Sequence, residues 1–229
     1  MSDGQTAIAM RATELLAQRG DPSQAAAMAA YMKTEMPFYG VSSPVRKTIS
    51  GTLRREFPAT MRSDYDRGVR ALWGGTHREE KYLAIAYARS FPRFVTASSI
   101  PMYRMMITRG AWWDLVDEIA SHLVGTVVHN QRGRLTPVMT SWTTSEDMWL
   151  RRTSIICQLR HKADTDTALL GIACTENLGS TEFFIRKAIG WALREYAKTN
   201  PAWVLGYVER HTDEMSGLTY REAMKHLNA

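Results

Sequence analysis

Helical periodicity runs through this sequence from end to end, interrupted only by short stretches rich in Gly, Pro and Ser. Apolar residues recur at steps of three and four, and we find neither the alternation of a half-buried strand nor an Asn-Gly hairpin signal. The segments expected to be helical are residues 6–19, 23–36, 42–57, 64–73, 78–91, 99–108, 112–128, 135–142, 145–159, 166–178, 181–200, 201–211 and 219–228. The pattern predicts an all-α protein.

About a dozen helices with short connections fold either as a compact bundle or as stacked helix pairs. A weak internal period favours the stack, because four Trp-containing segments recur about forty residues apart, within the range of HEAT-like repeats. They contain Trp73, Trp113, Trp149 and Trp191. In such a stack the Trp-bearing helices would line a concave surface.

Composition favours a polyanionic partner. The 229 residues include 29 Lys and Arg against 23 Asp and Glu, which gives a net charge of +6 and a pI of about 9.4. The first residues lack the apolar stretch of a signal peptide, and no segment approaches the roughly 20 apolar residues of a membrane span, so we expect a cytoplasmic protein without membrane contact.

No metal or other cofactor is expected. The chain has no phosphate-binding loop, no HExxH or GxSxG motif, and no His at metal-ligand spacing. Cys157 and Cys174 lie in apolar helical runs and are interpreted as small buried hydrophobic residues.

The segment 181–200 carries two different surfaces. Its core side consists of Ile185, Ala188, Ile189, Ala192 and Tyr196. Lys187, Trp191, Arg194 and Lys198 lie at i, i+4, i+7 and i+11, within about 60° of arc on a helix. An indole on this cationic stripe, facing away from the core side, suits nucleic acid. Alternatively, the indole fills a gap against a neighbouring helix and the cations lie in water.

Two charged side chains lie in otherwise apolar seams of their helices. Asp117 shares a face with Trp113, Val116, Ala120 and Val124, and Arg152 shares one with Met148, Ile155 and Leu159. A buried charge without a partner is costly, so either Asp117 or Asp114 could pair with Arg152 and join two helices. Alternatively these groups surround a cleft, where Asp117, Trp113 and Trp191 would form an anionic aromatic cage for a cation.

Five separated motifs resemble the AlkD family of DNA alkylation-repair glycosylases. They are AMAAYMK, RALW with REEKYLAI, RGAWWDLVDEI, WLRRTSIICQL and EFFIRKAIGWALREYAKTNP. The resemblance covers about residues 20–226 and is weakest in the first twenty residues and in residues 125–141. It implies one domain over residues 1–229, folded as a curved α-solenoid of HEAT-like repeats with about six antiparallel helix pairs.

The resemblance also implies site residues and a reaction. Trp113, Asp117 and Trp191 match the catalytic cluster, Arg152 the supporting Arg, and Tyr31 a Tyr near the N-terminus. The implied activity is monofunctional excision of bases alkylated at N3 of adenine or N7 of guanine from double-stranded DNA. Phosphate contacts are expected from the stripe cations, which are Lys187, Arg194 and Lys198.

Alternatives remain open at this point. The chain could be a non-catalytic helical-repeat scaffold that binds protein or DNA. If it is an enzyme, it could accept bulky adducts and serve in self-resistance to a DNA-alkylating natural product. We expect a monomer that associates with the nucleoid when it is bound to DNA.

Overall fold

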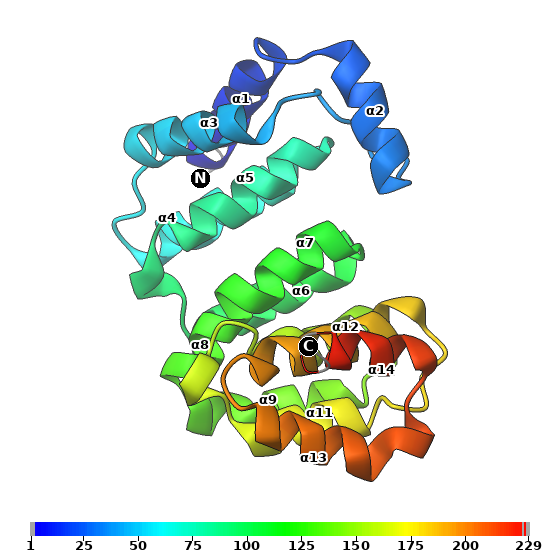
Figure 1. Cartoon of the computed structure of the whole chain (residues 1–229). Helices are drawn as coiled ribbons and strands as arrows, with labels where there is room; N and C mark the ends of the chain where they lie inside the picture. Colours follow the sequence, from blue (N-terminus) through cyan, green and yellow to red (C-terminus); the bar gives the residue numbers. More distant parts are fainter. Residues whose placement is uncertain (1–2, 226, 228–229) are drawn as a thin grey trace. The chain divides into compact units, whose positions relative to one another are not determined.

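The computed structural model describes residues 3–225 and residue 227, with side chains from residue 7 onward (Figure 1). Every regular element in this range is a helix, which confirms the all-α prediction. The chain divides after Val95 into two compact units, Met1–Val95 and Thr96–Ala229. The single domain expected from the sequence stays a prediction, and each unit is described by itself.

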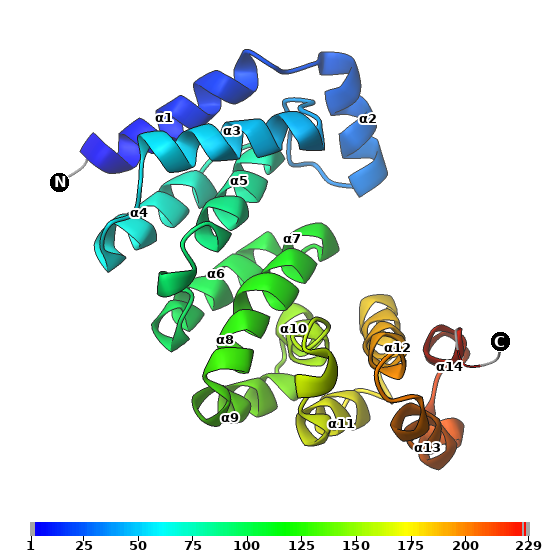
Figure 2. The ribbon, with the colours of Figure 1, turned by 60° about the vertical axis from the view of Figure 1, so that its left-hand side comes forward.

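The N-terminal unit contains five α-helices. They are α1 (Asp3–Ala17), α2 (Pro22–Met32), α3 (Ser43–Glu56), α4 (Arg62–Trp73) and α5 (Arg78–Arg89), followed by the 3-10 turn η1 (Pro92–Phe94). Helix α1 packs against α3 and α4, and α5 packs against α3 and α4 (Figure 2). Helix α2, which carries Tyr31, buries none of its residues. It is therefore held mainly through its two ends.

Both ends of α2 are fixed by polar contacts. At its start the Asp21 side chain accepts hydrogen bonds from the backbone N–H groups of Ser23 and Gln24, as an N-cap residue does. Beyond its end, the fully buried carboxylate of Glu79 on α5 accepts from the backbone N–H groups of residues 39, 40 and 41, at 2.9–3.1 Å. The loop from α2 to α3 is thus fastened to α5.

The C-terminal unit contains the remaining helices. They are α6 (Ile100–Gly110), α7 (Trp113–Glu118), α8 (Gly125–Asn130), α9 (Arg132–Thr143), α10 (Met148–Ile156), α11 (Thr167–Thr175), α12 (Phe183–Ala197), α13 (Pro201–His211) and α14 (Gly217–Met224). The short helical turns are η2 (Ala97–Ser99), η3 (Ile119–Val124), η4 (Lys162–Asp164) and η5 (Thr212–Glu214). Helix α12 packs against α10, α13 and α14, and its predicted core side is buried there.

One long helical run carries the first candidate residues. Helix α7, the π-helical turn η3 and α8 follow one another without a break from Trp113 to Asn130. The predicted helix over residues 112–128 is therefore confirmed, but its π-helical turn was not foreseen. π-Helical turns are rare and occur often at functional sites.

Several predicted helices are too long at their ends. The segment 23–36 ends at Met32 because Lys33 takes a left-handed conformation, with φ 49°. The segments 145–159 and 166–178 begin later than predicted, because Asp147 and Asp166 are N-caps whose side chains accept backbone hydrogen bonds. The last expected helix, 219–228, corresponds to α14, and residues 226 and 228 of that prediction lie outside the described residues.

The recurring Trp residues do not share one environment. Trp73 on α4 and Trp149 on α10 are buried, with exposed fractions of 5% and 7%. Trp113 on α7 and Trp191 on α12 are partly exposed. The prediction that the helices carrying these residues line one surface stays a prediction, and within it only Trp113 and Trp191 have indoles that are partly exposed.

Candidate functional site

The two charges that the sequence places in apolar seams meet in the structure. The guanidinium of Arg152 on α10 donates Nε–H to Oδ1 and Nη2–H to Oδ2 of Asp117 on α7, each at 2.7 Å. The side chain of Arg152 is 4% exposed, whereas that of Asp117 is 16% exposed. The hypothesis of a pair between these helices is thus confirmed with Asp117, and the pair leaves part of the Asp117 side chain open to solvent.

Two opposing effects act on the carboxyl of Asp117. Burial raises its pKa above the ordinary value, and the hydrogen bonds and positive charge of Arg152 oppose that rise. The neighbouring carboxylates of Asp114 and Glu118 raise it further, to a smaller extent. The charge on Asp117 therefore depends on Arg152.

An aromatic cluster holds Arg152 in place. Its Nη1 donates to the backbone carbonyl of Phe184 on α12 at 2.5 Å, and its guanidinium carbon lies 5.9 Å from the centre of the Phe184 ring. Phe184 packs against Trp112 and Trp149, with ring centres 5.4 and 5.1 Å away. The WW motif thus supplies Trp112 and the FF motif supplies Phe184 to the cluster around Arg152. The sequence reasoning missed this role.

Trp113 and Trp191 are partly exposed, so each indole can contact a ligand. Among the described residues, neither makes a ring–ring or cation–π contact of the kind that Trp112, Trp149 and Trp203 make. Trp113 lies one helical turn before Asp117 on α7. Trp191 lies two turns after Phe184 on the same side of α12, about 10 Å along the helix axis. Both indoles are therefore carried by elements that contact the Asp117–Arg152 pair.

Trp191 does not project wholly away from the core. It is partly buried and packs against the apolar cluster of the C-terminal unit. The sequence-based prediction that it faces away from that core is corrected accordingly, because the Trp191 side chain packs against residues of that cluster.

The stripe cations are all paired within the protein. Lys187 binds Oε1 of Glu222 on α14 at 2.6 Å, and Arg194 binds Oε2 of the same carboxylate. Lys198 binds Glu195 at 2.6 Å. The hydrogen bond from Lys187, followed by the charges of Lys187 and Arg194, lowers the pKa of Glu222. The alternative that these cations lie in water holds for Lys187 and Lys198, whose side chains are 42% and 54% exposed, although each of the three has a carboxylate partner.

Tyr31 belongs to the other compact unit. Its side chain on α2 is 74% exposed, which is high for an aromatic residue. Nothing in its own unit covers it, and α2 is fastened at both ends as described above. Tyr31 thus remains a candidate for contact with a ligand.

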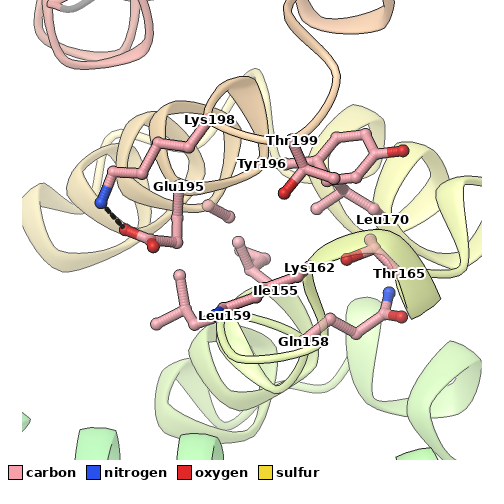
Figure 3. A pocket seen from close by; sticks show the side chains of 11 residues that line it. Ile155, Gln158, Leu159, Lys162, Thr165, Leu170, Glu195, Tyr196, Lys198 and Thr199 are labelled. Carbon is pink, nitrogen blue, oxygen red and sulfur yellow. Dashed lines mark hydrogen bonds and ion pairs between the residues drawn. The ribbon is translucent and has the colours of Figure 1, made fainter.

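A cavity of about 330 Å³ lies elsewhere in the C-terminal unit (Figure 3). It is lined by residues of α10, α11 and α12 and of the segments that follow α10 and α12, including Leu159, Thr165 and Tyr196. Trp113, Asp117 and Trp191 do not line it. The three candidate residues are therefore separate from this cavity, and all three are partly exposed.

The described residues lack two further kinds of feature. They contain no cluster of three or more His, Cys, Asp or Glu side chains arranged to hold a metal ion. No helix among them has both the length and the apolar character needed to cross a membrane.

Comparisons with known proteins agree on one family. The family model named DNA alkylation repair enzyme matches residues 12–227. A solved structure described as a predicted DNA alkylation repair enzyme from Enterococcus faecalis is 32% identical, covers 91% of this chain and 97% of its own, and superposes with a TM-score of 0.83. No curated protein sequence matches the chain.

A more distant solved structure shares the fold. The alkylpurine DNA glycosylase AlkC of Pseudomonas fluorescens, bound to DNA containing an abasic site analog, covers all of this chain and 63% of its own. Its sequence identity is 14% and its TM-score 0.51, so this likeness concerns the fold alone. The profile match over nearly the whole chain and the 32% identity show that the protein belongs to the DNA alkylation repair enzyme family.

Proposed function

We propose that the protein is a monofunctional DNA glycosylase that hydrolyses the N-glycosidic bond of N3-alkyladenine and N7-alkylguanine in duplex DNA. One observation carries the proposal. A partly exposed carboxylate, Asp117, is held by two hydrogen bonds from a buried guanidinium and lies one turn from a partly exposed indole. Membership of a family of DNA alkylation repair enzymes supports the same reaction.

The reaction needs no acid for the leaving group. A purine alkylated at a ring nitrogen carries a positive charge, so the electron pair of the breaking C1′–N bond neutralises it and the base departs uncharged. Positive charge then develops on the deoxyribose, as in glycoside hydrolysis. Asp117 stabilises that charge and orients the water that adds to C1′, and the water's proton is released to solvent.

The indoles and the cations have separate roles in this proposal. Trp113 and Trp191 offer π faces to the cationic nucleotide. Tyr31, Lys187, Arg194 and Lys198 contact the DNA backbone, which gives affinity with little sequence information. Arg152 is a positioning residue, because its guanidinium is buried and already binds Asp117 and Phe184.

The replacement Asp117→Asn tests the catalytic role. We expect it to abolish release of 7-methylguanine from alkylated duplex while duplex binding persists. Asp114→Asn, on the same helix, is the matched control and should retain release. Abasic sites measured in single-turnover assays give the readout, and undiminished release by the Asp117→Asn variant would remove this carboxylate from the mechanism.

The substrate's charge gives a second test. Excision should survive EDTA, because no metal enters the proposed steps, and it should fail on uracil, whose leaving group is uncharged. Binding of alkylated duplex by the wild-type protein without any release of base would identify a non-catalytic scaffold instead.

Substrate size follows from the openness of the site. Asp117, Trp113 and Trp191 are all partly exposed and lie outside the cavity described above, so at the proposed site an adduct on the base remains in solvent. We therefore propose that bulky N3-adenine adducts are also excised, which would suit self-resistance to a DNA-alkylating natural product. Comparison of excision rates for a methyl and a bulky adduct tests this, and a rate that collapses with adduct size would contradict it.

A further inference from the structure

Glu222 is placed where it holds two of the candidate phosphate-binding residues at once. Lys187 and Arg194 lie two turns apart on α12, and the carboxylate of Glu222 on α14 lies between them and binds both. The side chain of Glu222 is 16% exposed, that of Arg194 21% and that of Lys187 42%. This is a partly buried carboxylate with two cationic partners, unlike a solvated pair of long surface side chains.

The packing of α12 on α14 fixes this arrangement. Gly190 lies between the two cations, and a Cβ atom there would lie 2.4 Å from Cβ of Glu222 and 3.0 Å from the backbone oxygen of Thr219. The hydroxyl of Thr219 donates to the carbonyl of Arg186 at 3.3 Å. The helices therefore approach closely beside Glu222, which keeps its carboxylate against the cations.

The charge available to DNA on this stripe is small as a result. Lys187, Arg194 and Lys198 supply three positive charges, and Glu222 and Glu195 supply two negative charges within ion-pair distance. One net positive charge remains. A phosphate that approaches Lys187 or Arg194 thus meets a cation whose carboxylate partner is already in place.

We propose that Glu222 is an internal competitor of DNA phosphate that sets the affinity of this surface for duplex. The proposal rests on the proposed function, since it takes α12 to be a DNA-contacting helix. A phosphate that contacts Lys187 or Arg194 competes with the carboxylate of Glu222 for the same cation, so each contact contributes less than a contact from a free cation. Affinity for undamaged DNA is thereby kept low, and the protein leaves such sites more readily.

The isosteric change Glu222→Gln isolates this effect. It should bind undamaged duplex more tightly than wild type and add about one phosphate contact to the salt dependence, which steepens the slope of log K against log salt by about 0.9. Its advantage in affinity over wild type should therefore shrink about 3.5-fold from roughly 50 to 200 mM salt. Fluorescence anisotropy with labelled duplex measures both quantities.

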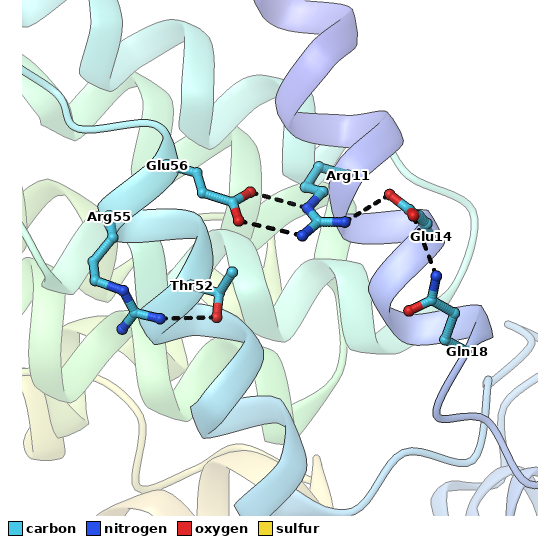
Figure 4. A network of polar contacts seen from close by, with 6 residues as sticks. All are labelled: Arg11, Glu14, Gln18, Thr52, Arg55 and Glu56. Carbon is cyan, nitrogen blue, oxygen red and sulfur yellow. Dashed lines mark hydrogen bonds and ion pairs between the residues drawn. The ribbon is translucent and has the colours of Figure 1, made fainter.

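Glu56→Gln is the matched control. Glu56 at the end of α3 is paired with Arg11 of α1, and its replacement changes the net charge by the same amount (Figure 4). Its affinity and salt slope should remain close to wild type. Equal gains in both variants would mean that only net charge matters and would overturn the proposal.

A double-mutant cycle ties the effect to the two cations. In a background with Lys187→Gln and Arg194→Gln, the change Glu222→Gln should bring no gain in affinity, and a persistent gain would overturn the proposal. Thermal melts check the fold, and Glu222→Asp, which shortens the side chain by one methylene, gives a smaller expected gain if the Gln variant fails to fold. If the wild-type protein does not bind duplex, the proposed function is contradicted. If the wild-type protein binds duplex and Glu222→Gln binds it with the same affinity, only this inference is contradicted.

Discussion

Neutralising Asp117 should destabilise the protein more than neutralising Arg152, although the two belong to one ion pair. Asp117→Asn leaves a guanidinium whose side chain is 4% exposed without a counter-charge. Removing one partner of a buried pair in this way costs about 3–5 kcal/mol. Arg152→Met leaves a carboxylate that is 16% exposed and can recruit water or take up a proton. We expect its cost to be nearer the roughly 1–3 kcal/mol of an unsatisfied polar group.

The difference of about 2 kcal/mol corresponds to melting temperatures about 4–8 °C apart for a chain of this size. Urea unfolding followed by Trp fluorescence is a suitable assay, because six of the seven Trp residues lie in the C-terminal unit with this pair. An Arg152→Met variant that is as unstable as Asp117→Asn, or less stable, would refute the reasoning from exposure.

The pH dependence of the Arg152→Met variant gives an internal check. Without the guanidinium, the folded-state pKa of Asp117 should rise further above its unfolded value, because burial is then opposed by less positive charge. A carboxyl with a raised folded-state pKa contributes stability that is present below its unfolded pKa and is lost as pH rises through the folded pKa. The stability deficit of Arg152→Met should therefore shrink as the pH falls, and a deficit that stays constant would contradict this account.

Three further predictions concern activity, packing and thiol chemistry. Excision by wild type should fall on the acid side with a midpoint above the ordinary Asp pKa of 3.8, and Arg152→Met should move that midpoint to higher pH in single-turnover profiles. Gly125→Ala should cost about 1–3 kcal/mol in urea unfolding, because its Cβ would lie 2.3 Å from the carbonyl oxygen of Cys157. By contrast, Gly133→Ala in α9 has nothing within 4 Å and should be neutral or stabilising by up to about 1 kcal/mol. Cys157 and Cys174 are fully buried, which raises the pKa of each thiol to about 12, so neither should react with a thiol reagent at about pH 8 until the protein unfolds.

Sequence reasoning was most successful where burial forces a pattern. Apolar periodicity located the helices, and the core side of α12 is buried as predicted. The pairing of Asp117 with Arg152 followed from the cost of an unpaired charge in an apolar seam. Helical periodicity alone left Asp114 open as an alternative partner of Arg152, because residues three positions apart on a helix point in similar directions.

Contacts between distant segments were beyond that reasoning. Glu222 lies 35 residues after Lys187 and 28 after Arg194, and a helical wheel treats α12 as if no other helix approached it. The ion pairs of Lys187 and Arg194 were therefore missed. The end of α2 was also predicted wrongly. A left-handed residue at a helix end is usually Gly, and here it is Lys33, so the sequence carries no signal for the end of the helix.

The π-helical turn η3 has a consequence for the lineage of this protein. A π turn holds about one residue more than the α turn it replaces. Loss of a single residue from Ile119–Val124 would restore regular winding and leave the residues on either side at nearly the same angular positions, because both kinds of turn cover one full rotation, so Asp117 would still face its guanidinium. Insertions and deletions, usually harmless only in loops, are thus absorbed inside this helical run, and a relative one residue shorter at this point keeps its acidic group on the same face.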